Sequence, residues 1–338
     1  MTRERILILL MAMLTTALFV ANLFVGTVDI PPLDVWNVLT GEADTVRPSW
    51  QFIVQEVRLP QALTALLCGA ALAASGLMLQ TAFRNPLAGP SILGIDSGAS
   101  LGVAIVMLLS GGSLMAGKMA LSGFLAVTVA AFVGAMAVMG LLLFFSTLLK
   151  SDVLLLIVGV MIGYAGSSII SLLNFFSTAE GVHSYMIWGM GSFGGVSMEQ
   201  MPWFASLVTV GIVLSLLMVK PLNAMLLGNQ YAENLGINMH RTRIYLLLTT
   251  GLLAASTTAF CGPISFLGLA VPHMARLLLR KADHRTLMPL SLLTGTTVAL
   301  LCNLLCTLPG DQGTVPLSAI TPLLGVPVIL YVLCHRRK

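Results

Sequence analysis

Residues 220–243 read KPLNAMLLGNQYAENLGINMHRTR and separate two long apolar runs. The segment is too polar to cross a bilayer. Its apolar residues stand in two groups at helical spacing, each followed by a glycine: Leu222, Met225, Leu226 and Gly228, then Ala232, Leu235 and Gly236. Glycine commonly ends a helix because it adopts the left-handed conformation without strain. The segment therefore predicts two short helices, which form either a docking surface or an ordinary connection between membrane spans.

The composition around this segment is that of an integral membrane protein. Of 338 residues, 57% are hydrophobic and 9% are charged, whereas about a quarter are charged in soluble domains. The apolar runs have the length of about 20 residues that a helix needs to cross a bilayer. We predict an all-α fold with about ten spans, at residues 6–26, 60–82, 91–110, 118–148, 153–176, 201–219, 243–261, 264–280, 286–307 and 316–334.

Basic residues orient these spans. An even number of spans puts both termini on one side, and that side carries fourteen Lys and Arg residues against three, Arg47, Arg58 and Lys118, on the other. Positive charge concentrates on the cytoplasmic side of membrane proteins. Both termini and residues 220–243 are therefore predicted to be cytoplasmic. The basic residues show no aromatic interleaving, which argues against nucleic-acid binding.

Two halves of the chain resemble each other weakly. Residues 71–98 contain ALAASG and then GPSILGI, and residues 252–268 contain LLAAST and then GPISFLG. The second set begins five spans after the first, so the repeats, spans 2–5 and 7–10, would be inverted in the membrane, as in many transporters. We predict one transmembrane domain over 1–338: a first span, an outer loop with a short helix at 27–57, a first repeat at 58–176, an outer helix and sixth span at 177–219, residues 220–243, and a second repeat at 243–334.

The chain shows no pattern for catalysis, a cofactor or a resident metal. Residues 112–119, GSLMAGKM, approach the phosphate-binding P-loop, but Met119 replaces the required Ser or Thr and the segment lies on the outer side. ATP hydrolysis would therefore need another subunit. Asp96 and Asp152 are expected near inner span ends, and an interior without carboxylates disfavours an ion-coupled secondary transporter. That alternative and a non-transporting scaffold stay open.

Small residues recur along the fifth span. Gly159, Gly163 and Ser167 form a ladder at helical spacing. Such ladders allow close helix packing. Packing is one interpretation, and the lining of a transport pathway is the other.

Three longer stretches together resemble a known family. They are RLPQALTALLCGAALAASGLMLQTAFRNPLAGPSILGIDSGA at 58–99, PLNAMLLGNQYAENLGI at 221–237 and GPISFLGLAVPHMARLLLRKADHRTLMPLSLLTG at 262–295. They are similar to the permease subunits of ATP-binding-cassette (ABC) importers for iron-siderophores, haem and vitamin B12. The resemblance implies ten spans per subunit in the bacterial cytoplasmic membrane, surrounded by lipid and paired as a homodimer or as two similar subunits.

The resemblance also implies roles for particular residues. The ATPase subunit would be contacted by Leu222, Leu226, Leu227, Gly228, Ala232, Leu235 and Gly236. The inner gate would comprise Asn85, Pro86 and Leu87 with Ser151 and Asp152, and the fifth and tenth spans would line the pathway. A substrate-binding protein would dock on outer arginines, here Arg58 and Arg47. ATP and magnesium would be bound by two partner ATPase subunits.

Some positions depart from the family pattern. Gln61 stands where family members often have arginine, and Asn303 and Thr307 stand where they often have aspartate and arginine. Outer docking could therefore rely on other contacts. The sequence hypothesis is a permease that imports an iron chelate, a siderophore complex or haem, with vitamin B12 as the alternative cargo.

Overall fold

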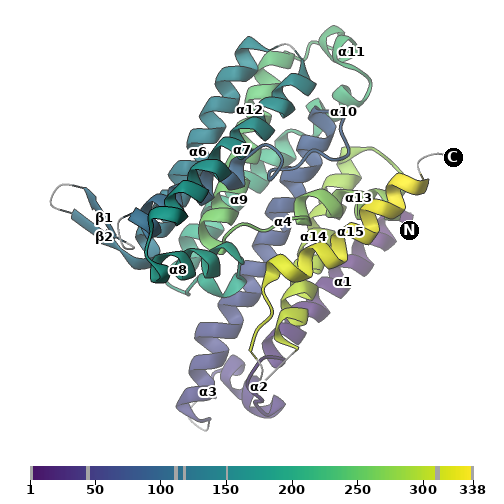
Figure 1. The fold of residues 1–338 in the computed structure, drawn as a ribbon. Helices are drawn as coiled ribbons and strands as arrows, with labels where there is room; N and C mark the ends of the chain where they lie inside the picture. Colours follow the sequence, from purple (N-terminus) through teal and green to yellow (C-terminus); the bar gives the residue numbers. More distant parts are fainter. Residues whose placement is uncertain are drawn as a thin grey trace.

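The protein is described here by a computed structural model that covers residues 3–42, 46–109, 113–116, 119–149, 151–308 and 313–335. Within these ranges, six helices are long and apolar enough to cross a membrane. They contain α1 (Arg3–Phe24), α4 (Leu59–Ala82), α6 (Gly123–Leu148), α7 (Asp152–Phe176), α12 (Met239–Cys261) and α14 (His284–Thr307). Figure 1 shows these helices as a tall bundle.

The remaining predicted spans correspond to bent or shorter helices. Helix α9 (Met201–Leu217) continues into α10 (Val219–Leu226) through a bend of 47°. Three shorter apolar helices follow the other predicted spans: α5 (Ile95–Ala104) with the π-helix η3 (Ile105–Leu109), α13 (Leu267–Leu279) and α15 (Leu317–His335). The all-α prediction is confirmed for the bundle, and about ten spans fit it when the bent pair and the short helices are included.

The two short helices α5 and α13 start inside the bundle after tight turns. Residues 83–94 lead into α5, and residues 262–266 lead into α13. The first turn contacts the start of α13, because a Cβ placed on Gly268 would lie 3.2 Å from Cδ of Pro90. Helix α4 precedes the first turn and α12 precedes the second, and α5 and α13 then run toward opposite ends of the bundle. This order is that of two inverted repeats.

Asp96 lies deeper than we expected from the sequence. Its carboxylate accepts a hydrogen bond of 2.9 Å from Thr258 Oγ1, and Thr258 lies one turn from the end of α12 that is opposite residues 220–243. The prediction that Asp96 sits at an inner span end is wrong. The turn at 83–94 carries the chain back into the bundle before α5 begins.

Helix α4 is the centre of the bundle. It packs against α1, α9, α12, α13 and α14, and most of its residues are buried. Glycines permit the closest approaches: a Cβ on Gly76 would stand 1.6 Å from the Gly268 carbonyl oxygen, and one on Gly69 would stand 2.3 Å from that of Gly295. Helix backbones in membranes approach this closely only at small residues.

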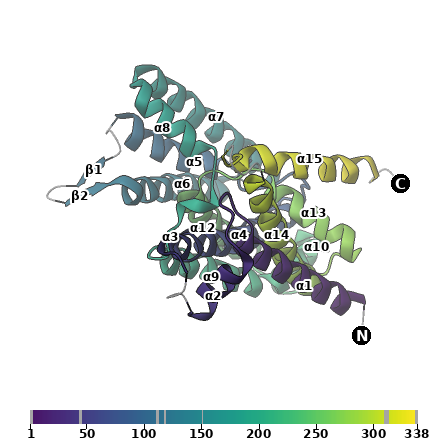
Figure 2. The same ribbon diagram turned by 90° about the horizontal axis from the view of Figure 1, so that it is seen from below.

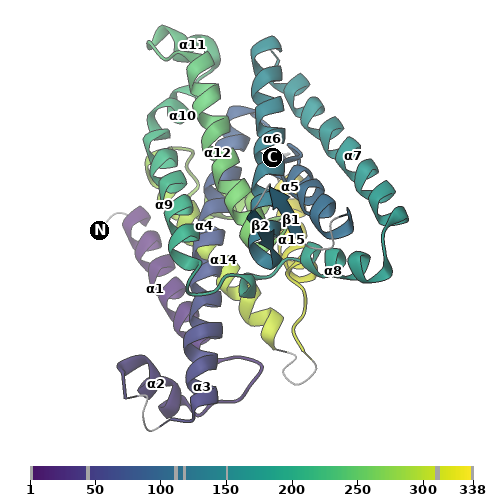
Figure 3. The same ribbon diagram turned by 90° about the vertical axis from the view of Figure 1, so that its left-hand side faces the viewer.

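The end of the bundle that carries α2 is a separate small layer. Helix α2 (Pro32–Thr40) starts at a proline and ends at Gly41, whose φ of 93° is left-handed. Helix α3 (Pro48–Phe52) and the π-helix η2 (Ile53–Arg58) extend α4 outward, as Figure 3 shows. Five buried residues form a second core there: Ile30, Val35, Val38, Val46 and Val54.

The predicted span 118–148 starts too early. Strands β1 (Ser113–Ala116) and β2 (Met119–Ser122) pair antiparallel, with Ser113 opposite Ser122. Gly123, with φ of 62°, is the first residue of α6 and directly follows the second strand. The hairpin projects from the bundle beside α8 (Ala179–Gly189), as Figure 2 shows. Gly112 and Lys118 of the P-loop-like stretch lie outside the described residues.

Candidate functional site

Residues 220–243 form the two predicted short helices at one end of the bundle. Helix α10 is followed by Gly228, with φ of 116°, and α11 (Asn229–Asn234) is followed by Gly236, with φ of 82°. Both glycines therefore have backbone angles that other residues rarely adopt. Helix α10 packs against α14 and α4, and α11 packs against α10 and α12. We call this the α10 end, and the opposite one the α2 end.

The residues predicted to contact an ATPase divide into two sets. Leu222 and Ala232 are fully buried, so they hold the short helices on the bundle and do not face outward. Leu226, Leu227 and Leu235 are exposed by 46%, 64% and 58%. Sequence reasoning missed Tyr231, which is exposed by 52%. Its position four residues before Leu235 on the same helical face is the signal that could have identified it.

The predicted gate turn is tied to α13. Oδ1 of Asn85 accepts a bond of 2.9 Å from the Leu87 backbone N–H. The Pro86 carbonyl lies 2.7 Å from Nε2 of His273, and since a carbonyl only accepts, that nitrogen carries the proton. Ser151 caps its own helix by accepting from Leu154 N. The side chain of Asp152 lies outside the described structure.

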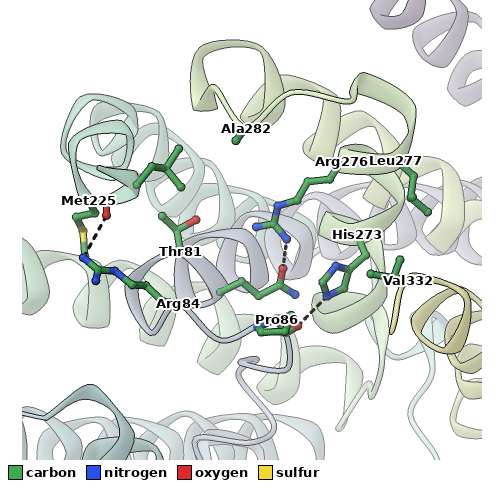
Figure 4. A pocket seen from close by; sticks show the side chains of 11 residues that line it. Thr81, Arg84, Pro86, Met225, His273, Arg276, Leu277, Ala282 and Val332 are labelled. Carbon is green, nitrogen blue, oxygen red and sulfur yellow. Dashed lines mark hydrogen bonds between the residues drawn. The ribbon is translucent and has the colours of Figure 1, made fainter. Parts of the chain in front are cut away.

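A cavity of about 520 Å³ opens between α10, α4, the gate turn and α13 (Figure 4). Arg276 donates to Oε1 of Gln80 at 2.5 Å, and Nε2 of Gln80 donates to the Leu269 carbonyl at 3.0 Å. Val332 of α15 completes the wall. Motif residues almost 200 positions apart in sequence thus meet at one point, which connects α4, α13 and the gate turn.

The ladder on α7 is partly a packing surface. A Cβ on Gly159 would lie 2.9 Å from Cα of Leu93, and one on Gly163 would lie 3.4 Å from Oγ of Ser97. Ser167 is exposed, and Gly166 takes its place with a Cβ position 3.6 Å from Cβ of Ser97. The inclusion of Ser167 in the packed ladder is therefore wrong, because the face toward α5 follows the 3.6-residue period.

Arg58 is not available as an outer docking residue in this structure. It is exposed by only 5%. Its guanidinium donates to the carbonyls of Leu23 (3.1 Å), Phe24 (2.9 Å) and Val28. The Leu23 and Phe24 carbonyls end α1 and would otherwise lack helical partners, and Val28 lies in the connection after α1. Arg47 is exposed, with its guanidinium 4.7 Å from the centre of the Trp50 ring.

The two residues that differ from the family pattern at positions 61 and 303 are hydrogen-bonded to each other. Nε2 of Gln61 donates to Oδ1 of Asn303 at 2.9 Å, and Nδ2 of Asn303 donates to Oδ1 of Asn22 at 2.7 Å. Asn22 in turn donates to the Leu300 carbonyl at 3.1 Å. A neutral chain of amides therefore joins α1, α4 and α14 where the family pattern places opposite charges.

Comparison with known proteins identifies the family of the chain and finds relatives whose names state their cargo. The sequence model of the FecCD transport family matches residues 13–335. The vitamin B12 import system permease protein BtuC of Klebsiella pneumoniae is 35% identical over 85% of this chain and 84% of its own length. BtuC of Escherichia coli O9:H4 is 34% identical over 87% of each chain.

Solved structures show the same architecture. A structure described as an inward-facing conformation of a metal-chelate type ABC transporter has a TM-score of 0.82 at 28% identity, covering 98% of this chain and 99% of its own. PsaBC from Streptococcus pneumoniae has a TM-score of 0.55 at 16% identity, covering 81% and 90% of the two chains. The second likeness concerns the fold alone.

Proposed function

The chain belongs to the FecCD transport family and is a permease subunit of an ABC importer, and from this premise we propose that its cargo is a bulky metal chelate. Vitamin B12, a cobalt chelate, is the first cargo to test, because BtuC relatives at 34–35% identity import it. A ferric siderophore or haem is the second, supported by the likeness to a metal-chelate type transporter.

Uptake by cells separates these cargoes. A strain that carries the chain and a strain from which it is deleted are each given radiolabelled cyanocobalamin, a ferric hydroxamate or haem. We expect deletion to abolish uptake of one of the three and to leave the others unchanged. Unchanged uptake of all three would reject the proposed cargo class. Abolition of uptake by ATP depletion, with no effect of a proton ionophore, distinguishes ATP-driven import from an ion-coupled carrier.

The α10 end of each of two permease copies is proposed to dock one ATPase subunit, two in the assembly, with both termini on the same cytoplasmic side. The support is the cluster of exposed apolar side chains on two short helices, Leu226, Leu227, Tyr231 and Leu235. Exposed apolar clusters of this kind mark protein interfaces. The N-terminus lies at this end too, since Glu4 pairs with Lys281 at 2.5 Å, next to Asp283, which bonds Asn223 of α10.

Replacement of Leu227 by Asp tests the docking site. We expect the ATPase that co-purifies with the permease to fall at least about tenfold, because a carboxylate loses its hydration in an apolar contact. Leu33→Asp is the matched control: Leu33 is exposed by 70% on the short helix α2 at the opposite end. Equal loss of the ATPase from both variants, or from neither, would reject the assignment.

A second permease copy is proposed to pack against α7 and α15, with the pathway between the copies. Both helices carry large exposed apolar residues, among them Tyr164, Phe175 and Leu323, exposed by 69%, 81% and 70%. Formation of a disulfide between two copies of a Leu323→Cys variant tests whether a second copy packs against α15.

A substrate-binding protein is proposed at the α2 end, where Arg47 remains a candidate contact and Arg58 does not.

A further inference from the structure

A polar joint connects α10 to the ends of α4 and α14. Asn223 lies within α10, and its Oδ1 accepts from the backbone N–H of His284 (2.8 Å) and lies 2.9 Å from the ring atom Nδ1. On the other side of the ring, Nε2 lies 2.9 Å from Oγ1 of Thr81, near the end of α4. The His284 residue is exposed by only 1%. One imidazole therefore bridges three helices.

The hydrogen positions in this joint follow from the available donors. Nδ2 of Asn223 donates to the carboxylate of Asp283 at 2.6 Å, so Oδ1 faces His284 and can only accept. Nδ1 of His284 must then carry a proton. In the neutral imidazole Nε2 is an acceptor, so the single proton of the Thr81 hydroxyl has two acceptors, Nε2 and the Leu77 carbonyl, each at 2.9 Å. Both bonds between His284 and Asn223 therefore run in one direction, from His284 to Oδ1 of Asn223.

The joint lies next to the bonds that hold the gate turn. Gln80, beside Thr81, is bound by Arg276 of α13, and the same helix holds Pro86 through His273. Figure 4 shows Thr81 between Met225 of α10 and Arg276 of α13. The chain passes from Thr81 into the gate turn within four residues. Displacement of α10 would thus reach the gate through the end of α4.

We propose that Asn223 and His284 are positioning residues that transmit movement of α10 to the end of α4 and the gate turn. The proposal rests on the proposed docking of an ATPase at the α10 end. Apolar contacts by Leu222 and Met225 also hold α10, but burial of apolar surface is non-directional and tolerates sliding. The hydrogen bonds to His284 fix one register, so their removal uncouples α10 from α4 without releasing the ATPase.

The test uses the permease purified with its ATPase from native membranes and placed in lipid nanodiscs. Cys334, exposed whereas the other four cysteines are buried, is replaced by Ser. Leu87, exposed by 41% in the gate turn, is replaced by Cys as a reporter. The rate of maleimide modification is measured with and without ATP and vanadate. In the otherwise unchanged chain we expect ATP and vanadate to change this rate.

His284→Ala and Asn223→Ala should each reduce the ATP-driven change at least tenfold while the ATPase co-purifies at the normal ratio. His284→Asn retains a donor near the position of Nδ1 but loses the contact of Nε2 with Thr81 of α4, so it should also reduce the change. Thr297→Val is the matched control: it removes a buried bond of 2.8 Å to Thr15 from the same helix α14, away from α10, and should leave the change intact. If the His284→Ala variant does not fold, the Asn223→Ala variant still tests the proposal, because Asn223 is partly exposed.

Three results would overturn the proposal. The first is a full ATP-driven change in both alanine variants, which would mean that apolar packing alone transmits the movement. The second is loss of the ATPase from those variants, which would assign the joint to the folding of α10. The third is absence of the ATPase from the unsubstituted preparation, which would reject the docking site and, with it, the role of the joint.

Discussion

The two ends of the bundle are held by polar contacts of different kinds. At the α2 end, the amides of Asn22, Gln61 and Asn303 and the guanidinium of Arg58 connect long helices and their connections to one another. At the α10 end, His284 and His273 connect long helices to short elements, α10 and the gate turn. Short elements with few contacts can move at low cost in free energy. The comparison therefore indicates that the α2 end is fixed and that the α10 end contains movable joints.

The largest effect is expected from a substitution at the close contact between α4 and α13. In Gly76→Ala the new Cβ would stand 1.6 Å from the Gly268 carbonyl oxygen, so α4 and α13 must separate. We expect a loss of more than about 3 kcal/mol in unfolding free energy, measured by thermal unfolding in detergent. Gly140→Ala is the control, since a Cβ there meets nothing within 4 Å. Equal unfolding temperatures for the two variants would contradict the close contact.

Arg58→Met tests whether Arg58 stabilises the α2 end of the bundle instead of binding a partner. The carbonyls of Leu23, Phe24 and Val28 would lose their charged donor, at a cost of about 2–4 kcal/mol. The unfolding temperature should fall, and uptake should fall only as far as the amount of folded protein does. A variant that unfolds like the unsubstituted chain but no longer binds the substrate-binding protein would restore Arg58 as a docking residue.

The amide pair Gln61 and Asn303 can be converted into a charged pair. Gln61→Arg alone should cost about 1–3 kcal/mol, because it introduces a partly buried charge without a carboxylate. Adding Asn303→Asp should recover most of that loss, since the two side chains already lie 2.9 Å apart. A double-mutant cycle of unfolding free energies measures the coupling. Simple additivity would show that the pair does not act together.

The smallest expected effect concerns pH at the α10 end. The backbone N–H of Arg285, followed by the amide of Asn223, lowers the pKa of Asp283. A lowered pKa in the folded state adds stability above the ordinary value of about 3.9 and loses it as the pH falls through the folded value. Unfolding temperatures between pH 6 and about pH 3 should therefore fall slightly more for the unsubstituted chain than for Asp283→Asn. An identical pH profile would remove Asp283 from the joint.

Local chemistry explains what the sequence predicts well. Gly41, Gly228 and Gly236 end short helices because each requires a backbone angle that is a property of the residue itself. The spans follow from apolar length, and the two-helix character of residues 220–243 follows from apolar spacing. These features need no knowledge of the rest of the fold.

How deep a residue lies in the bundle, and which residues far apart in the sequence touch, could not be predicted in this way. Residues 91–110 have the length of a full span, but the turn before α5 reaches into the bundle and takes Asp96 with it. Leu222 and Leu226 are one turn apart, and only their packing shows that the first is buried and the second exposed. The motifs mark His273 and Pro86, yet a contact over 187 residues appears only in the fold.

The central claim is that the α10 end receives the ATPase. The most direct measurement is backbone hydrogen exchange of the permease alone and in complex with its ATPase, both in nanodiscs. We predict slower exchange on complex formation in α10 and α11, residues 219–234, and no change in α2 and α3 at the opposite end. Protection at the α2 end, or unchanged exchange in α10 and α11, would contradict the account.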